Sequence, residues 1–292
     1  WRFLLASLIR VAGDLANLYP VFALASIITF LSHYEPGESI KYIYSGYVIS
    51  EGESKKTMSQ KKYIGLDIGS VSVKAVLINE RKEILENHYV RSHGQTVETF
   101  LLVLKDIFNR THIDDIDGIA ITGTGGKLVS ELMNIAFINE VVAHSTATTT
   151  LYPEVRTIIE IGGEDSKLML IERDASTQQT KVSDFSMNTM CAAGTGSFLD
   201  QQATRLGVAI EKEFGELALK SKNPPRIAGR CSVFAKTDMI HLQQEGTPVY
   251  DIVAGLCYAM ARNFKSNIGK GKEFLKPIVF QGGVAANVGM IK

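Results

Sequence analysis

One short pattern occurs twice in this chain of 292 residues, and it constrains the fold more than any other feature. The segments 63-YIGLDIGSVSVKAVLI-78 and 158-IIEIGGEDSKLMLI-171 each predict a strand, a tight glycine turn and a returning strand. The residues that match without gaps are Asp67 and Glu160, Ile68 and Ile161, Gly69 and Gly162, Lys74 and Lys167, Leu77 and Leu170, and Ile78 and Ile171. A repeat with the same internal spacing indicates a duplicated domain.

The segments between the two copies predict one α/β unit. A strand, 83-EILENHYV-90, precedes a helix, 96-TVETFLLVLKDIFNR-110, and 118-GIAITGTGG-126 predicts a strand that runs into a glycine turn. A second helix begins at about Lys127, so the order is βββαβα, and the second half starts the same way at Thr157. The predicted apolar face of the first helix comprises Val97, Phe100, Leu101, Leu104, Ile107 and Phe108.

Each hairpin has the composition of a phosphate-binding turn. Glycine lets the backbone approach a phosphate without an intervening Cβ, and the N–H groups of the turn can point at it. An acidic residue just before the turn, such as Asp67, can hold Mg²⁺ through water, because that ion keeps much of its hydration shell. Two such hairpins could clamp one nucleotide, and an ordinary hairpin with a surface acid is the alternative for each.

Further candidate residues lie in and after the glycine turns. Glu164 and Asp165 follow the second turn and could order an attacking water or the metal ion. In 277-PIVFQGGVAANVGM-290, a Gly-Gly turn after a buried strand could admit a flat ring or a ribose. The predicted catalytic residues are Asp67, Glu160, Glu164 and Asp165. The predicted nucleotide-binding residues are Gly69, Ser70, Val71, Lys74, Gly123, Gly125, Gly162, Gly163, Gly282, Gly283 and Asn287.

Charge and cysteine content exclude some classes of protein. With 31 basic and 31 acidic residues, the chain lacks the electrostatic footprint of a nucleic-acid-binding protein. Three cysteines are too few for a disulfide framework, which favours a reducing compartment. The apolar run 15-LANLYPVFALASIITFL-31 is short for a bilayer span and Pro20 interrupts it, so a membrane is not an expected partner. Residues 1–60 are predicted to be an N-terminal extension or leader outside the core fold.

Two cysteines lie where a helix is predicted to begin. Cys191 in 188-NTMCAAGTGSFLDQ-201 and Cys231 in 229-GRCSVFAKTDMIHLQQ-244 each precede a helical run. A thiolate at a helix N-terminus is stabilised by the macrodipole and by unpaired N–H groups. Cys257, in contrast, lies in the apolar segment 251-DIVAGLCYAMARNF-264 and is expected in the core.

The role of these two thiols has several candidate answers. A nucleophile would need a nearby base, and neither cysteine has one in its local sequence. Zinc would normally need four ligands, and CxxC pairs are absent. Two thiolates from each of two chains would be enough for a [4Fe–4S] cluster on a symmetry axis. A buried, apolar cysteine is the remaining alternative for each.

Five sequence blocks together resemble a known family. They are GLDIGSVSVKAVL, ITGTGG, EIGGEDSK, NTMCAAGTGSFLD with GRCSVFAKTDM, and FQGGVAANVG. From about Lys61 to Lys292 the chain is similar to the BadF/BadG/BcrA/BcrD ATPase family, specifically to activators of 2-hydroxyacyl-CoA dehydratases. The resemblance implies the α/β fold of actin, sugar kinases and heat-shock chaperones, in which duplicated ribonuclease-H-like (actin-like ATPase) domains face a nucleotide cleft. The first subdomain would span 61–150, completed by about 270–292, and the second, with the cysteines, 151–269.

The same resemblance implies a function. In that family one [4Fe–4S] cluster bridges a homodimer through two cysteines from each subunit, which by motif are Cys191 and Cys231 here. ATP/ADP and Mg²⁺ would be the other cofactors of this ATP hydrolase coupled to electron transfer. The reduced cluster would pass one electron to a 2-hydroxyacyl-CoA dehydratase, after reduction by a ferredoxin- or flavodoxin-type protein. An oxygen-sensitive cluster implies a cytoplasmic, anaerobic setting.

Three alternative functions use the same fold. One is the ATPase subunit of a benzoyl-CoA reductase, which has the same cluster and a different partner. Another is a small-molecule kinase, such as an amino-sugar kinase, which needs no cluster. The third is an ATP-binding regulator without redox work. A cluster held by Cys191 and Cys231 separates the last two from the first.

Overall fold

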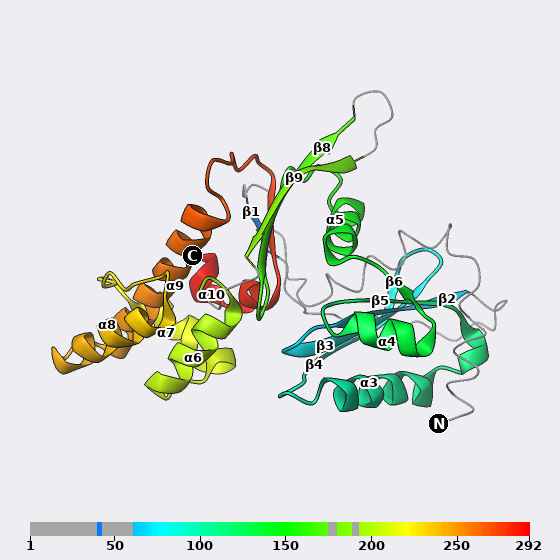
Figure 1. The fold of residues 1–292 in the computed structure, drawn as a ribbon, viewed down its shortest axis with the longest axis horizontal. Helices are drawn as coiled ribbons and strands as arrows, with labels where there is room; N and C mark the ends of the chain where they lie inside the picture. The colour runs from blue at the N-terminus through cyan, green and yellow to red at the C-terminus, as the bar shows by residue number, and fades with distance from the viewer. Residues whose placement is uncertain (1–39, 43–60, 175–179, 189–192) are drawn as a thin grey trace. The chain divides into compact units, whose positions relative to one another are not determined.

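The chain folds into two compact units, each built on a five-stranded sheet (Figure 1). The structure is a computed structural model that describes residues 40–42, 61–174, 180–188 and 193–292. The first unit ends at Pro153; the second comprises the described residues after it, together with residues 40–42. Among the described residues, no helix has the length and apolar character needed to cross a bilayer.

The sheet of the first unit has the strand order β4-β3-β2-β5-β6. Strands β2 and β3 form the first predicted hairpin, and β4 continues it antiparallel. On the other side of β2, strands β5 and β6 are added parallel. The strands are β2 (Lys62–Ile68), β3 (Ser72–Asn79), β4 (Ile84–Arg91), β5 (Ile116–Thr122) and β6 (Ala136–Phe137). The central strand β2 therefore carries Asp67 at its carboxyl end.

Both faces of this sheet are apolar, so both are covered by helices. α3 (Thr96–Arg110) and α4 (Gly126–Met133) pack on one face, and α5 (Glu140–Leu151) packs on the other (Figure 1). Helix α3 has the predicted bounds, but one part of its predicted face is wrong. Val97 is 51% exposed, whereas Val103 is buried against the sheet together with Phe100.

The sheet of the second unit has the order β1-β10-β7-β8-β9. Strands β7 and β8 form the second predicted hairpin, β9 continues it antiparallel, and β10 is parallel to β7. The prediction that residues 270–292 complete the first subdomain is therefore wrong, because β10 hydrogen-bonds to the hairpin of the second unit. The strands are β1 (Ile40–Tyr42), β7 (Thr157–Ile161), β8 (Ser166–Arg173), β9 (Thr180–Asn188) and β10 (Ile278–Gln281).

The duplication extends to the topology of both sheets. Listed from the antiparallel edge, the strand orders are β4-β3-β2-β5-β6 and β9-β8-β7-β10-β1. In both sheets the first three strands are antiparallel to one another, and the last two are added parallel. Strand β1 takes the edge position that β6 has in the first unit, although it comes from the segment predicted to lie outside the core. Its three residues pair parallel with β10. The predicted duplicated α/β fold is confirmed.

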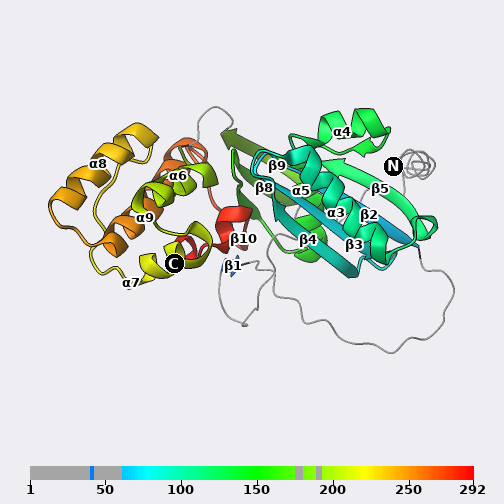
Figure 2. The same cartoon turned by 90° about the horizontal axis from the view of Figure 1, so that it is seen from below.

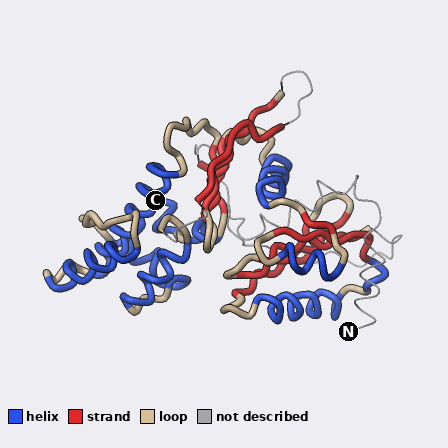
Figure 3. The backbone as a smooth tube through the Cα atoms, viewed as in Figure 1, coloured by secondary structure: helices blue, strands red, loops and turns tan. Residues whose placement is uncertain are grey.

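A group of helices lies between β9 and β10 in the chain (Figures 2 and 3). Helix α9 is its apolar centre, because Ile252, Leu256 and Met260 are fully buried there. Cys257 is also buried in α9, which confirms it as a core residue, and burial raises the pKa of its thiol to about 12. The helices of this unit are α6 (Gly196–Leu206), the π-helix η3 (Ile210–Phe214), α7 (Gly215–Lys220), α8 (Ser232–Gln244), α9 (Val249–Asn267), the 3-10 helix η4 (Gly283–Ala286) and α10 (Val288–Ile291).

Candidate functional site

Each hairpin holds its acidic residue against the lysine that lies opposite on the next strand. In the first unit, Lys74 Nζ lies 2.6 Å from Asp67 Oδ2. In the second, Lys167 Nζ lies 2.9 Å from Glu160 Oε2 and also 2.8 Å from Asp165 Oδ1. The matched acid and lysine of the two sequence copies are thus ion pairs in both units. In the second, one ammonium lies between two carboxylates.

The first turn is held from outside by a serine. Gly69 N–H donates to Ser72 O at 3.0 Å and closes the turn. Ser92 then binds two carbonyl oxygens of the turn, through its N–H to Val71 O and its hydroxyl to Ser70 O, both at 2.9 Å. Because these contacts use only carbonyl oxygens of Ser70 and Val71, they leave the N–H groups of the turn for an anion.

The second turn has the same closing hydrogen bond and a different attachment. Gly162 N–H donates to Asp165 O at 2.9 Å. Gly162 O accepts from Gly196 N–H at 2.7 Å, and Gly163 O accepts from both the N–H and the hydroxyl of Ser197, at 2.8 and 2.6 Å. The second turn is therefore hydrogen-bonded to the N-terminus of α6.

A further pair of equivalent glycines follows the parallel strands. Gly123 comes after β5 with φ +93°, and a Cβ on it would lie 2.5 Å from Ile68 O. Gly282 comes after β10 with φ +92°, and a Cβ on it would lie 2.3 Å from Ile161 O. Both glycines were predicted to bind nucleotide, but their equivalence was missed. The signal was available, since each directly follows the strand that lies parallel to the hairpin.

Buried polar atoms without partners lie close to two predicted binding residues. Thr122 Oγ1 is buried on β5 opposite Asp67, and it makes no hydrogen bond among the described residues. The same holds for Asn287 Nδ2, whose Oδ1 accepts from Gly289 N–H at 3.0 Å. Buried polar groups are normally paired, so these two atoms fit a polar ligand. A hydrated Mg²⁺–nucleotide offers donors and acceptors of this kind.

The remaining predicted residues fall near the same turns. Gly125 N–H donates to Ile68 O at 2.8 Å, which places it beside the end of β2. Gly283 opens η4 and is exposed. Glu164 is exposed and forms no ion pair with the described part of the chain. Of the two predicted acids after the second turn, Asp165 is therefore bound to Lys167, and Glu164 extends into solvent.

Cys231 begins a helix, as the sequence predicted. It is the N-cap residue of α8, and its carbonyl accepts from Ala235 N–H at 3.0 Å. Its thiol is free and the residue is partly exposed. Because the first N–H groups of a helix have no partner within it, this position suits an anionic group.

The loop before Cys231 is fixed at three points. Ala228 N–H donates to Asp238 Oδ2 at 2.8 Å, and Arg262 Nη2 donates to Ile227 O at 2.9 Å. Gly229 lies so close to α9 that a Cβ would come within 2.3 Å of Ala259 O. Asp238 and Arg262 thus position the loop that carries Cys231. Sequence reasoning missed both roles, because neither residue is near its partner in the chain.

A comparison with protein-family models decides the family of this chain. The model described as the BadF/BadG/BcrA/BcrD ATPase family matches residues 64–292. The chain belongs to the BadF/BadG/BcrA/BcrD ATPase family. The predicted family is thereby confirmed.

Several known proteins and solved structures are similar to this chain over most of their length. The 2-hydroxyisocaproyl-CoA dehydratase activator of Clostridioides difficile is 32% identical over 231 residues, which are 78% of this chain and 83% of that protein. The crystal structure of Acidaminococcus fermentans (R)-2-hydroxyglutaryl-CoA dehydratase component A superposes with a TM-score of 0.71 at 29% identity, over 79% of this chain and 86% of that chain. A structure of the 2-hydroxyisocaproyl-CoA dehydratase activator from Clostridium difficile with bound ADPNP gives 0.69 at 31% identity, over 79% and 83%.

Cys191 lies outside the described residues, as do residues 189, 190 and 192, and the structure describes Asn188 before this gap and Ala193 after it. Asn188 and Ala193 line a cavity of about 200 Å³ together with Arg230, the neighbour of Cys231. Asn188 Nδ2 donates to Ala193 O at 3.1 Å, and Ser166 Oγ donates to Gly194 O at 2.6 Å. Asn188 and Ala193, the described residues nearest to Cys191 in the chain, therefore line a cavity beside the residue that precedes Cys231.

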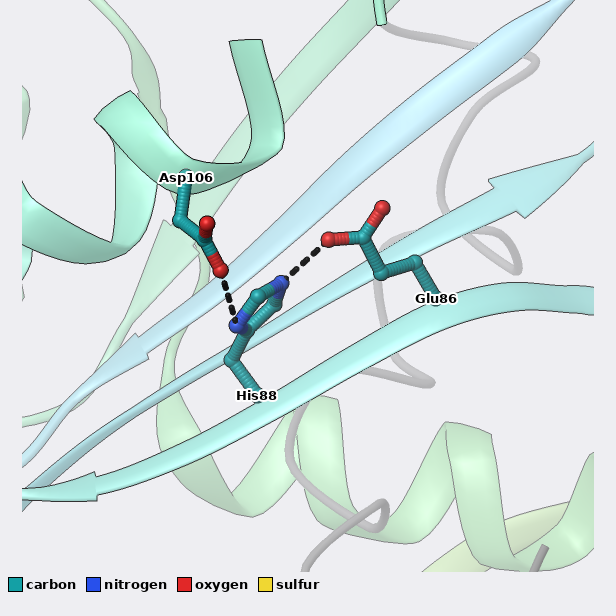
Figure 4. Close-up of side chains that lie close together, drawn as sticks. All are labelled: Glu86, His88 and Asp106. Carbon is teal, nitrogen blue, oxygen red and sulfur yellow. Dashed lines mark hydrogen bonds and ion pairs between the residues drawn. The ribbon is translucent and has the colours of Figure 1, made fainter. Parts of the chain in front are cut away.

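One other cluster in the described part of the chain has metal-ligand chemistry. Glu86 and His88 on β4 lie beside Asp106 on α3, with His88 Nε2 2.5 Å from Glu86 Oε1 and Nδ1 3.6 Å from Asp106 Oδ2 (Figure 4). Arg110 Nη2 lies 2.7 and 2.6 Å from the same two carboxylate oxygens. The guanidinium thus takes the place that a cation would need, and the cluster joins β4 to α3.

Proposed function

We propose that this protein is an ATP-dependent one-electron donor that activates a 2-hydroxyacyl-CoA dehydratase. In the proposal, Cys191 and Cys231 from each of two subunits hold one [4Fe–4S] cluster. The observation that carries it is the position of Cys231, a free, partly exposed thiol at the N-terminus of α8. The 32% identity to a dehydratase activator supports the same assignment.

The nucleotide would be bound by the hairpin turns and the glycines beside them. Asp67 would hold Mg²⁺ through water, and Lys74 would balance its charge, since the pair lies 2.6 Å apart. The N–H groups at Ser70 and Val71 would bind phosphate, while Gly282, Gly283 and Asn287 would lie near the ribose or base. Glu164 would order the attacking water, because Asp165 is already held by Lys167.

Three hydrogen bonds join the second turn to the start of α6, the helix that follows the Cys191 segment. The second turn binds the start of α6 through Gly162 O and Gly163 O, and Gly196 and Ser197 lie only a few residues after Cys191. A Cβ on Gly196 would come within 2.9 Å of Gly162 O, so the contact is also sterically tight. A shift of the second turn on nucleotide binding would therefore move the start of α6 with it.

The cluster would supply a site that accepts and releases one electron. The residues of this chain would hold it and adjust its surroundings. Cys231 would supply a thiolate ligand, and the loop held by Asp238 and Arg262 would set its position. The N-terminus of α8 stabilises negative charge beside it.

Exposed apolar residues next to Cys231 support a dimer. Val233 and Phe234, in the first turn of α8, are 67% and 65% exposed. Ile240, two turns further along, is 44% exposed. A symmetric contact between two copies would bury this surface and bring two Cys231 residues to one axis.

The proposal is tested by anaerobic reconstitution with iron and sulfide. The wild-type protein should show a charge-transfer band and bind about four iron atoms per dimer, as the cluster type requires. Cys231→Ser and Cys191→Ser should lose the band and weaken the dimer, whereas ATP hydrolysis should partly survive. Cys257→Ala is the matched control and should keep its iron, because Cys257 is buried in α9. A Cys191/Cys231 double variant that keeps its colour would refute the ligand assignment.

The choice of electron acceptor needs a separate assay. The reduced protein and ATP are added to an inactive 2-hydroxyacyl-CoA dehydratase or to a benzoyl-CoA reductase. Activation of the dehydratase supports the proposal. Turnover with the reductase alone would assign the protein to that enzyme instead.

A further inference from the structure

The wall around Cys231 carries a concentration of positive charge. A cavity of about 680 Å³ opens there, and Cys231 is one of its lining residues. No carboxylate lines it, whereas four cationic side chains do: Arg226, Arg230, Arg262 and Lys265. We call this cavity the basic groove. All four cations are exposed, and none forms an ion pair with a carboxylate in the described part of the chain.

The basic groove is built on fixed backbone. Arg226 and Arg230 lie in the loop before α8, and Arg262 and Lys265 lie one turn apart on α9. Because Arg262 Nη2 holds the Ile227 carbonyl, the loop and the helix present their cations together. Apolar residues, among them Ile227 and Phe234, complete the lining. Charges of one sign beside a low-dielectric wall concentrate the field and attract an anionic partner.

We propose that the basic groove docks the acidic face of a small redox protein that supplies the electron. This inference rests on the proposed function. The donor is oxidised by one electron, the cluster held by Cys231 and Cys191 accepts it, and no proton or atom is exchanged. Electron-transfer complexes are typically small and short-lived, and charge complementarity sets their association rate.

Two features favour this occupant over a second copy of the chain. A symmetric contact of one basic groove with another would place cations against cations, which disfavours the pair. The groove also includes Cys231 itself, so a partner seated there lies against a cluster ligand. The exposed apolar residues Val233 and Ile240, which do not line the groove, remain the better surface for the second copy.

The test uses two cations that make no hydrogen bond in the described structure. Arg226→Gln/Lys265→Gln removes two charges from the groove and leaves Arg262 to hold the loop. Lys105→Gln/Lys127→Gln is the matched control, because it removes the same charge from exposed positions of the first unit. Binding of a fluorescently labelled, strongly acidic ferredoxin to the reconstituted oxidised protein is followed by stopped-flow anisotropy.

At about 10 mM ionic strength, the groove variant should lose about tenfold in the association rate constant, and the control should stay within about twofold of wild type. The difference should shrink at about 150 mM, where screening is stronger. Equal rates for the groove variant and wild type would overturn the docking site. A groove variant that loses affinity for the dehydratase but not for ferredoxin would also overturn the docking site. Circular dichroism checks the fold, and Lys265→Glu alone provides a second variant with the same expected direction.

Iron content and the charge-transfer band are measured on the same samples. If wild-type protein takes up no iron, the proposed function fails whatever the binding result. If it takes up iron and the groove variant binds ferredoxin like wild type, only the docking inference fails. The two outcomes are therefore distinguishable.

Discussion

The two hairpins share a backbone design and differ in charge. Each pairs an acid with a lysine seven residues later, across the same strand register. In the first, Asp67 pairs with Lys74, whereas in the second Lys167 lies between Glu160 and Asp165. Lys167 is also 1% exposed, so its pairing takes place in a drier environment. The sequence repeat therefore preserved the geometry of the pair while its electrostatics diverged.

The hairpins also differ in what holds their turns. The first turn is bound by Ser92, which follows β4 in the same sheet. The second is bound by the N-terminus of α6, in the helical group that carries Cys231. Duplicated turns can thus acquire different tasks through their neighbours. The first turn is suited to binding a ligand. A shift of the second turn on ligand binding would move the start of α6, which is hydrogen-bonded to it.

The largest expected difference comes from removing the two lysines. Lys167→Met should lower the free energy of unfolding by about 3–5 kcal/mol, because it removes the cation that pairs with the buried carboxylate of Glu160. Lys74→Met should cost about half as much, since the side chain of Lys74 is 18% exposed, against 2% for Lys167, and its pair is less completely removed from water. Urea unfolding followed by circular dichroism measures both, with the exposed Lys270→Met as a control within about 0.5 kcal/mol. Equal losses for the two lysines would show that burial does not distinguish the hairpins.

A smaller effect should come from the equivalent glycines, and it should be the same in both units. Gly123→Ala places a Cβ 2.5 Å from Ile68 O, and Gly282→Ala places one 2.3 Å from Ile161 O. Both glycines have a positive φ. Each should lower the free energy of unfolding by about 3 kcal/mol. Gly271→Ala, at φ +73° with nothing within 4 Å, isolates the backbone cost and should lose only about 1 kcal/mol. If Gly282→Ala lowered the free energy of unfolding no more than Gly271→Ala does, the close approach of Gly282 to Ile161 would be contradicted.

Local patterns in the sequence were enough to predict the hairpins, the helix at 96–110 and the start of α8 at Cys231. These features depend on neighbours in the chain: a glycine at a turn, an apolar period, a helix N-terminus. The fold and the family followed from the order of such elements. The matched acid and lysine were also visible, because a tight turn places them opposite each other.

Contacts between distant segments could not be predicted in the same way. Strand β1 pairs with β10 across more than two hundred residues, and no periodic signal marks a three-residue edge strand. The placement of β10 in the second sheet, rather than with the first unit, depends on which strand it pairs with. The roles of Asp238 and Arg262 likewise depend on a loop folded between α8 and α9. These strand pairings and loop contacts depend on the packing of the folded chain, which local patterns in a single sequence do not specify.

The smallest effects concern the two serines that hold the turns, and they test the comparison most directly. Ser197→Ala and Ser92→Ala each remove one hydroxyl hydrogen bond to a turn carbonyl, at a cost of about 1 kcal/mol. Only Ser197→Ala should loosen the start of α6, because Ser197 is the residue of that helix that binds the second turn. Amide hydrogen exchange of residues 193–199 should therefore quicken about fivefold in Ser197→Ala and stay unchanged in Ser92→Ala.

A second helix variant separates this link from general weakening of α6. Thr204→Ala removes the hydroxyl contact of Thr204 to Asp200 O inside α6 and leaves the second turn untouched. It should not change the exchange of residues 193–199. With ADPNP bound, wild type should gain protection there, since a ligand that stabilises the second turn also stabilises what the turn holds. Ser197→Ala should gain less, and an equal gain in both proteins would mean that the nucleotide reaches the cysteine segment by another route.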